Sequence, residues 1–355
     1  MITRKGKGYE FAETSPDKYH GVAPFEIANG IPPLQKRKDK KYSSFSEAFA
    51  DSLCGFASGD KSIAAISAAM SSGTGLDSFE SMFPDRFFDV GIAEQHAITM
   101  AAGMACAGIK PVVAIYSTFL QRAYDQWLHD IALQDLHVVT CIARAAIVGE
   151  DGETHQGIYD IALLNSVPGM TIFAPRDFNE LNDMLDHALF SCKGPVAIRY
   201  PRGGEPASAS RYHVSDEADR SDFSPRLLEQ GNDVTIVTEG IMFSYAVQAS
   251  EMLKDKGITC DIIDIRTLKP INDSLILASA RKTGAVVTVE NGISHGGMGS
   301  CVESILSDKR IDACITKLGV KDRPLLQGKI SELLRSEKLD AEGICEAVCD
   351  LLQKH

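Results

Sequence analysis

Several features that would identify a class of protein are missing from this sequence. No apolar run is long enough to span a bilayer, so no membrane segment is predicted. The basic residues 1–8 are followed by no apolar segment, so no signal peptide is predicted there. The nine cysteines include no Cys-x-x-Cys pair, and most, such as Cys106, Cys141 and Cys260, lie in apolar segments. They indicate reduced core residues of a cytoplasmic protein.

Positive charge is also scarce. The net charge is −12 and the sequence pI about 5.2, so general binding to nucleic acid is not expected. Any anionic substrate must therefore be held by local arginines or lysines. The Walker loop, a Gly-x-Gly-x-x-Gly turn after a strand and a His-Glu-x-x-His helix are all absent from the sequence.

One motif match points to a hydrolase. Gly292-Ile293-Ser294-His295-Gly296 fits the Gly-x-Ser-x-Gly nucleophile elbow and follows a predicted strand. A hydrolase of that type needs an acid and then a histidine after the serine. Apart from the adjacent His295, the only later histidine is the terminal His355. A chain end does not orient a general base, so the hydrolase interpretation is disfavoured.

The pattern that is present is typical of α/β proteins. The 355 residues, 44% hydrophobic and 24% charged, suit a globular protein of two or three domains. Strands and helices alternate from residue 42, which predicts parallel sheets covered by helices on both faces. The predicted strands are 63–68, 87–90, 111–116, 138–143, 171–174, 196–200, 234–238, 260–265, 285–289 and 313–318. The predicted helices are 46–58, 97–107, 121–134, 158–165, 178–190, 245–256, 274–282, 299–306 and 341–353.

Composition divides the chain into four segments. Residues 1–41 are rich in charge and proline and are predicted to be an arm or linker. Residues 42–203 form the first α/β domain and residues 226–355 a second, smaller one. Between them, residues 204–225 are rich in Gly, Ser, Pro and charge and are predicted to be a domain linker.

Chemistry-bearing residues gather in loops that follow predicted strands. Ligands of open parallel sheets bind beyond the carboxyl ends of the strands, so these loops are the candidate site. The candidates are Glu94 and His96 in the first loop, Tyr116, Phe119 and Arg122 in the second, Arg144, Asp151 and His155 in the third, and Arg199 and Arg202 at the end of the domain. Each has a structural explanation when taken singly, but their convergence on one sheet edge favours a functional site.

Glu94 is the central candidate. It lies between a predicted strand and a small-residue helix, among apolar neighbours. A carboxylate there must either stay uncharged or pair with a specific donor. From its position alone, Glu94 is better explained as a structural glutamate that interacts with the helix dipole, and the functional interpretation stays open here.

Three stretches resemble one known family. Residues 85–97 (Asp-Arg-Phe-Phe-Asp-Val-Gly-Ile-Ala-Glu-Gln-His-Ala), 116–126 and 149–157 are similar to the pyrimidine-binding region of the 1-deoxy-D-xylulose-5-phosphate synthases, which are thiamine-diphosphate-dependent transketolase-like enzymes. The resemblance extends from Lys5 to the last helix. It implies a transketolase-like pyrimidine-binding domain and a transketolase C-terminal domain. It also implies condensation of pyruvate, with loss of CO2, onto glyceraldehyde 3-phosphate.

The resemblance assigns roles to individual residues. Glu94 matches the glutamate that bonds N1′ of the cofactor aminopyrimidine and favours the imino tautomer, whose nitrogen removes the thiazolium C2 proton to give the ylide. Glu94 and His155 are thus the expected catalytic residues. Phe119 is expected to stack on the pyrimidine, and Tyr9 matches a tyrosine that contacts the cofactor. The residues that match the substrate channel are Tyr116, Arg122, Arg144, Asp151, His155 and Arg202, with the arginines binding phosphate.

Two departures from the family pattern stand out. The family binds Mg²⁺ and the diphosphate through Gly-Asp-Gly and a later Asn on its first domain, and this sequence has no Gly-Asp-Gly. We therefore expect no metal ligands in this chain and weak binding of thiamine diphosphate by the chain alone. The family also reads Asp-Arg-Ala-Gly where this chain reads Ala143-Arg144-Ala145-Ala146. This change bears on the geometry around Arg144.

Several interpretations stay open at this point. The chain is one subunit of a split synthase, a fragment of a longer enzyme, a non-catalytic or regulatory paralogue, or a β-type subunit of another split transketolase or 2-oxo acid enzyme. In the enzyme interpretations, the diphosphate domain covers one face of this chain. We therefore expect a homodimer, a hetero-oligomer with a diphosphate-binding subunit, or both, and no nucleic acid or membrane partner.

Overall fold

A computed structural model describes residues 3–16, 19, 25–30, 41–212 and 221–354. The chain divides into two compact units between Ser43 and Ser44. The smaller unit contains helix α1 (Glu10–Thr14). Its aromatic rings pack on one another, with the Tyr9 ring centroid 5.6 Å from that of Tyr19 and 5.9 Å from that of Phe25.

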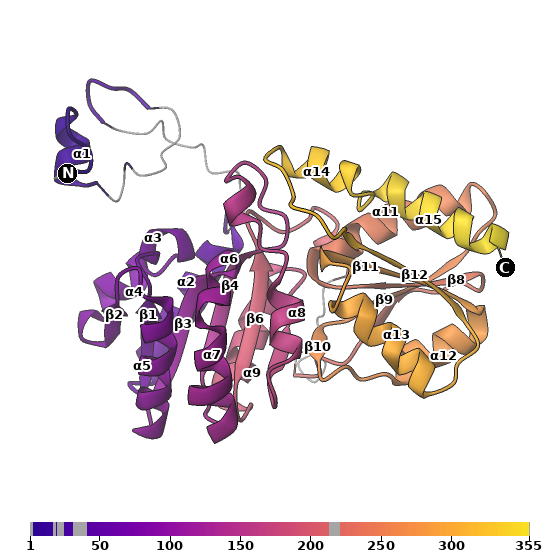
Figure 1. Cartoon of the computed structure of the whole chain (residues 1–355), viewed down its shortest axis with the longest axis horizontal. Coiled ribbons are helices and arrows are strands. Elements are labelled where there is room, and N and C mark those ends of the chain that lie inside the picture. The colour runs from indigo at the N-terminus through magenta and orange to yellow at the C-terminus, as the bar shows by residue number, and fades with distance from the viewer. Residues whose placement is uncertain (1–2, 17–18, 20–24, 31–40, 213–220, 355) are drawn as a thin grey trace. The chain divides into compact units, whose positions relative to one another are not determined.

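The larger unit contains two sheets, of which the first has seven strands in the order β10-β5-β6-β4-β3-β1-β2 (Figure 1). Its strands are β1 (Ile63–Ser67), β2 (Phe87–Asp89), β3 (Lys110–Tyr116), β4 (Val139–Ala145), β5 (Thr171–Phe173), β6 (Val196–Pro201) and β10 (Thr267–Lys269). The paired strands are parallel except β10, which runs antiparallel to β5. The central strands are apolar almost throughout because helices cover both faces.

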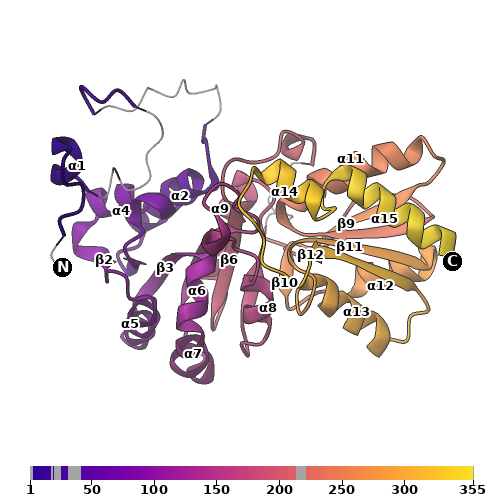
Figure 2. The ribbon, with the colours of Figure 1, turned by 45° about the horizontal axis from the view of Figure 1, so that its top comes forward.

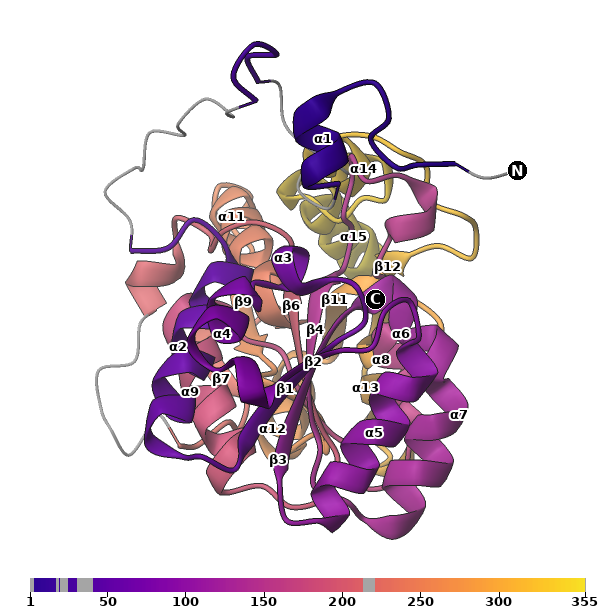
Figure 3. The same cartoon turned by 90° about the vertical axis from the view of Figure 1, so that its left-hand side faces the viewer.

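Helices lie on both faces of the seven-stranded sheet. α2 (Phe45–Gly59) and α9 (Phe178–Phe190) pack together on one face, while α5 (Glu94–Cys106) and α7 (Tyr124–Gln126) lie on the other (Figure 3). Ser44 caps α2 by accepting a hydrogen bond from the Glu47 N–H at 3.2 Å. The shorter helical segments of this part are α3 (Ser71–Thr74), α4 (Asp77–Met82), α6 (Ser117–Leu120), α8 (Asp160–Asn165), η1 (Pro84–Arg86), η2 (Gln121–Ala123), η3 (Trp127–Ile131), η4 (Ala132–Gln134), η5 (Glu153–His155) and η6 (Ala209–Tyr212).

The second sheet has five strands in the order β12-β11-β8-β9-β7. They are β7 (Arg226–Glu229), β8 (Val234–Thr238), β9 (Cys260–Asp264), β11 (Ala285–Ile293) and β12 (Cys314–Val320), and β7 alone among these described strands is antiparallel to its neighbour. α11 (Phe243–Lys254) and α15 (Ala341–Lys354) lie together on one face of this sheet, and α12 (Ser274–Thr283) and α13 (Met298–Asp308) on the other (Figure 2). The remaining segments are η7 (Gly240–Met242) and α14 (Ile330–Ser336).

The predicted fold class is confirmed: the chain is α/β with two mostly parallel sheets. The prediction missed the two antiparallel strands, β7 and β10, because both are short and lack a long apolar run. The helix predicted at 121–134 is broken into η2, α7, the π-helical η3 and η4. Residues 71–74, which belong to no predicted helix or strand, form α3. The predicted arm 1–41 and linker 204–225 lie partly outside the described residues.

Buried ion pairs join the two sheets. Arg199 on β6 donates to Asp160 at 3.0 Å. It also donates at 2.7 Å to Glu239, which directly follows β8 of the second sheet. A second set pairs Arg176 with Asp264 at 3.2 Å and Arg266 with Glu180. We call these seven buried residues the seam network: Asp160, Arg176, Glu180, Arg199, Glu239, Asp264 and Arg266.

No helix within the described ranges has the length and apolar character required to cross a membrane. The described residues also contain no disulfide bond.

Candidate active site

Eight of the predicted site residues meet at the carboxyl edge of the seven-stranded sheet. Each touches at least one other member by an ion pair or ring contact, so they form one connected group, which we call the site cluster. Its members are Glu94, Tyr116, Phe119, Arg122, Arg144, Asp151, His155 and Arg202. The parallel strands β3, β4 and β6 end at this edge, which explains why residues far apart in sequence converge there.

Glu94 is the first residue of α5 and is only 4% exposed. Its Oε1 accepts a hydrogen bond from Arg122 Nη1 at 2.8 Å, and the Arg122 side chain is itself half exposed. Of the two states predicted for this carboxylate, the structure therefore shows the paired one. The position in the first turn of α5 still suits a helix-dipole interaction, so the geometry by itself leaves the structural interpretation open.

Phe119 is the centre of the cluster. Its ring lies 5.6 Å from that of His155 in an edge-on arrangement and 6.0 Å from that of Tyr116 in a stacked one. The Arg122 guanidinium lies 5.0 Å from the ring centroid. Phe119 thus connects the glutamate side of the cluster to the arginine side and presents a half-buried aromatic surface between them.

Tyr116 is buried against a glycine that the sequence did not single out. A Cβ atom added to Gly73 would lie 1.5 Å from the Tyr116 hydroxyl oxygen, so any side chain at 73 would displace the tyrosine. Burial raises the pKa of Tyr116 above its ordinary value, although Arg144, 4.2 Å above the ring, acts in the opposite direction. The glycine-punctuated stretch 71–75 was visible in the sequence, but nothing local indicated what it faces.

Asp151 lies between two arginines. It forms ion pairs with Arg144 and, at 2.9 Å, with Arg202. All three side chains are between 18% and 38% exposed, so solvent and small solutes reach them. Two guanidinium groups and one carboxylate leave one net positive charge, which suits an anionic ligand.

The backbone around Arg144 shows the effect of the departure from the family pattern. Arg144 and Ala146 have φ values of +54° and +79°, in the left-handed region that favours glycine. By the resemblance, Ala146 stands where a glycine is expected, and its left-handed backbone conformation is one that an alanine side chain disfavours. The N–H of Ala146 still donates to the Gly157 carbonyl oxygen at 2.6 Å, which closes the following loop.

Three candidates lie outside the site cluster, and one of them, Arg199, is a buried member of the seam network. Tyr9 is in the smaller unit, where its hydroxyl donates to the Ile27 carbonyl oxygen at 2.9 Å. His96 is exposed on α5. Within the described residues, no three His, Cys, Asp or Glu side chains are placed to bind one metal ion.

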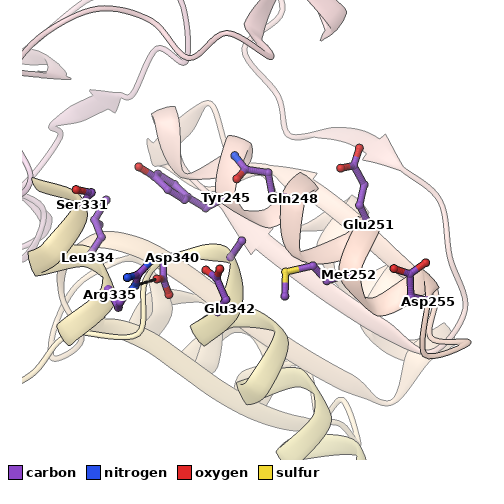
Figure 4. Close-up of a pocket in the computed structure, with 11 residues that line it drawn as sticks. Tyr245, Gln248, Glu251, Met252, Asp255, Ser331, Leu334, Arg335, Asp340 and Glu342 are labelled. Atoms are coloured by element: carbon purple, nitrogen blue, oxygen red, sulfur yellow. Dashed lines mark hydrogen bonds and ion pairs between the residues drawn. The ribbon is translucent and has the colours of Figure 1, made fainter.

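A large groove lies away from this cluster, between α11 and the α14–α15 segment (Figure 4). It encloses about 630 Å³ and is lined by the carboxylates Glu251, Asp255, Asp340 and Glu342 around Tyr245 and Met252. Arg335, its one lining cation among the described residues, is paired with Asp340 at 3.3 Å. An acidic groove of this kind does not suit a phosphate-bearing substrate, so the site cluster remains the candidate active site.

Comparison with known proteins identifies the two domains. Residues 41–206 match the family model "Transketolase, pyrimidine binding domain", and residues 225–344 match "Transketolase, C-terminal domain". The chain is also 33% identical to a solved "Split gene transketolase, inactive beta4 tetramer", with a TM-score of 0.76, covering 87% of this chain and 98% of that one. The chain belongs to the transketolase family. The site cluster therefore lies in a transketolase pyrimidine-binding domain.

Curated relatives narrow the resemblance further. The chain is 43% identical to the 1-deoxy-D-xylulose-5-phosphate synthase of Caldanaerobacter subterraneus subsp. tengcongensis, over 98% of this chain and 54% of that protein. It is 44% identical to 1-deoxy-D-xylulose-5-phosphate synthase 1 of Geobacter sulfurreducens, over the same shares. The chain spans about half the length of these curated relatives. A transketolase of Pichia stipitis, at 18% identity and a TM-score of 0.73 over 89% of this chain and 46% of that one, shares the fold.

Proposed function

We propose that this chain provides the pyrimidine-binding and C-terminal domains of a 1-deoxy-D-xylulose-5-phosphate synthase, which condenses pyruvate, with loss of CO2, onto glyceraldehyde 3-phosphate. The observation that carries the proposal is the buried Glu94 carboxylate beside an aromatic and arginine-rich cluster. The identity of 42–46% to such synthases supports the same reaction.

The residues present fit the aminopyrimidine end of thiamine diphosphate. When bound, this cofactor supplies the carbon nucleophile that attacks the carbonyl group of pyruvate. Glu94 offers a buried oxygen acceptor for a ring nitrogen, and the half-buried ring of Phe119 offers a face for stacking. Arg122 engages one of the two carboxylate oxygens, Oε1, so Glu94 can accept a further hydrogen bond through the other.

The arginine side of the cluster suits the acceptor substrate. Arg144 and Arg202 bind the phosphate of glyceraldehyde 3-phosphate, and Asp151 keeps the two guanidinium groups together between binding events. His155, edge-on to Phe119, lies between this phosphate site and the glutamate and moves protons during condensation. Tyr116 lines the same channel.

The diphosphate and Mg²⁺ are held by a domain that this chain does not provide, on a partner subunit or another part of a longer enzyme. The functional assembly is a homodimer or a hetero-oligomer in the cytoplasm. The solved split-gene transketolase favours a second candidate function, because this chain matches 98% of its length. In that case the chain is the β-type subunit of a transketolase, and ketose phosphates replace pyruvate as donors.

The test combines the chain with the diphosphate-binding domain of a relative such as the Geobacter sulfurreducens synthase. We expect CO2 release from pyruvate that depends on glyceraldehyde 3-phosphate. Glu94→Gln should lower the rate by a factor of about 10² because the amide cannot stabilise a protonated ring nitrogen. The control Glu80→Gln changes an exposed glutamate of α4 and should leave the rate unchanged.

Three outcomes would count against the proposal. A normal rate in Glu94→Gln together with lower thermal stability would identify Glu94 as a helix-start residue. Turnover of ketose phosphates without turnover of pyruvate would favour the split transketolase. No turnover of either donor would favour a non-catalytic paralogue.

A further inference from the structure

We propose that Gln156 is a positioning residue through which the C-terminal domain holds Asp151 and His155 in the substrate site. The loop concerned, residues 147–156, carries both side chains and is called the substrate loop. The inference rests on the proposed function for its effect on the reaction. Its structural part can be tested without turnover.

The two ends of the substrate loop are fixed by a pair of backbone hydrogen bonds. The Ala146 N–H donates to the Gly157 carbonyl oxygen at 2.6 Å, and the Gly157 N–H donates back to Ala146 at 2.8 Å. A Cβ atom at Gly157 would lie 2.2 Å from the Arg144 carbonyl oxygen, so the chain passes itself closely here. The bridge sets the loop ends but leaves the residues between them to be held by other contacts.

The Gln156 side chain supplies such contacts from inside the loop. It is only 3% exposed. Its Oε1 accepts hydrogen bonds from the N–H groups of Val148 at 2.9 Å and Gly149 at 3.4 Å. Its Nε2 donates to the carbonyl oxygen of Leu326, in the C-terminal domain, at 3.2 Å. The buried amide of Gln156 thus joins Val148 and Gly149, in the first half of the substrate loop, to the C-terminal domain.

The C-terminal domain contacts the substrate loop at two further points. Asn291 Oδ1 accepts a hydrogen bond from the Ile147 N–H at 3.1 Å, and Gln327 Nε2 donates to the Glu150 carbonyl oxygen at 2.9 Å. Gly149 packs closely against the segment at 328–330, because a Cβ atom there would lie 2.9 Å from the Gly328 carbonyl oxygen. The first half of the substrate loop therefore packs against the C-terminal domain.

The other half of the loop faces the site cluster. Asp151 pairs with Arg144 and Arg202, and His155 packs edge-on against Phe119. The Thr154 carbonyl oxygen accepts a hydrogen bond from the Thr118 hydroxyl at 2.7 Å. Since Gln156 is adjacent to His155 and holds the residues just before Asp151, its three hydrogen bonds set both side chains at once. A buried amide that loses its partners is costly, so alternative loop positions are disfavoured.

The experiment compares Gln156→Met, which has a similar length and no amide, with Gln134→Met, a matched change at an exposed glutamine of η4. The first measurement is amide hydrogen exchange of the substrate-free chain. Val148, Gly149 and the residues up to 155 should exchange at least about tenfold faster in Gln156→Met, with the strands β3, β4 and β6 unchanged. Gln134→Met should leave the exchange of the loop as in the wild type.

The second measurement is the kinetics of the assembled enzyme. The KM for glyceraldehyde 3-phosphate should rise about tenfold in Gln156→Met, with the KM for pyruvate within about twofold of the wild type. A merely structural role would lower the active fraction and leave both KM values in place. Glutamate at 156 keeps the acceptor for the Val148 N–H and loses the donor to Leu326, so Gln156→Glu should recover protection at Val148 without recovering the KM.

The outcomes separate the positioning of the loop by Gln156 from the proposed function. Wild-type exchange of the loop in Gln156→Met would overturn it, and so would faster exchange spread evenly over the whole chain. Equal rises in both KM values would also overturn it. A wild-type assembly with no activity would refute the proposed function, whereas local loosening of the loop in the exchange experiment would still support the positioning of the loop by Gln156.

Discussion

The site cluster and the seam network both combine arginines with carboxylates, yet they are built differently. In the seam network, Arg199 is 4% exposed, and its donors are used by Asp160, Glu239 and the Asn291 carbonyl oxygen. In the site cluster, the Arg202 side chain is 38% exposed, and Arg202 and Arg144 both form an ion pair with the same carboxylate, that of Asp151. The first arrangement satisfies its charges with protein groups, whereas the second leaves donors available to a ligand.

The pKa values of the seam network reflect its burial. Burial opposes the charge of Arg199, but Asp160 and Glu239 outweigh burial and raise its pKa above the ordinary value. Burial together with the neighbouring Glu180 raises the pKa of Asp264 to about 7. The seam network is thus a buried set of interacting charges, and removal of one partner should destabilise the folded protein. The comparison separates a partly exposed arginine–carboxylate cluster, which we propose binds a ligand, from a buried network in which protein groups pair the charges and join two sheets.

The largest effect is expected when one partner of the seam network is removed. Arg199→Met leaves Asp160 and Glu239 buried without their counter-charge and should lower the free energy of unfolding by about 3–5 kcal/mol. Urea denaturation followed by circular dichroism measures it. Arg202→Met, the matched change in the site cluster, should cost less than about 1 kcal/mol because its side chain is partly solvated. Equal losses in the two variants would remove the distinction drawn above.

The next effect concerns Glu290, which lies beside the seam network on β11. Burial raises its pKa to about 7, although the N–H groups of Gly299 and Met298 donate to it and favour the charged form. The folded pKa exceeds the unfolded value of about 4.5, so the folded protein binds the proton more tightly. Stability from this group is therefore fully present below about pH 4.5 and is lost as the pH rises to about 7.

That loss amounts to about 3.5 kcal/mol at most, since each pH unit between the two pKa values is worth about 1.4 kcal/mol. Glu290→Gln cannot ionise and should flatten the stability profile between pH 5 and pH 8 relative to the wild type. Parallel profiles for the two proteins, measured by denaturation at each pH, would show that Glu290 titrates normally.

The same Arg202→Met variant should reveal the ligand-binding character of the site cluster. Charge-assisted hydrogen bonds contribute about 1.5–3 kcal/mol. On the proposed function, the affinity of the assembled enzyme for glyceraldehyde 3-phosphate should therefore fall by a factor of about 10 to 10². Calorimetric titration measures it, with Arg211→Met, an exposed arginine outside the cluster, as the control. Unchanged affinity would place the phosphate elsewhere.

The smallest effect is expected at Ala146. An L-residue in the left-handed region costs about 1–2 kcal/mol, so Ala146→Gly removes this backbone strain. The same change loses a buried methyl group and raises the entropy of the unfolded chain, which offsets the gain. Stability should change by less than about 0.5 kcal/mol. Ala101→Gly, at an equally buried position inside α5, should cost about 1.5 kcal/mol. A cost at Ala146 that matches the cost at Ala101 would show that the family's glycine position carries no backbone strain here.

The sequence by itself determined the two helix-covered sheets and the sheet edge where the candidate site lies. Apolar runs such as 63–67 and 285–289 predict buried parallel strands because only strands covered on both faces tolerate them. Loops that follow parallel strands share one edge, so Glu94, Phe119 and Arg144 could be expected together before any coordinates.

The tertiary structure decided the contacts that give those residues their environment. The short β10 joins the first sheet, with Thr267 paired to Phe173, and no local pattern signals that pairing. Arg122 lies on Glu94, Gly73 makes room for the Tyr116 hydroxyl, and Gln156 reaches Leu326 in the other domain. These are contacts between residues far apart in the chain, whose partners depend on how two sheets pack rather than on the periodicity of either segment.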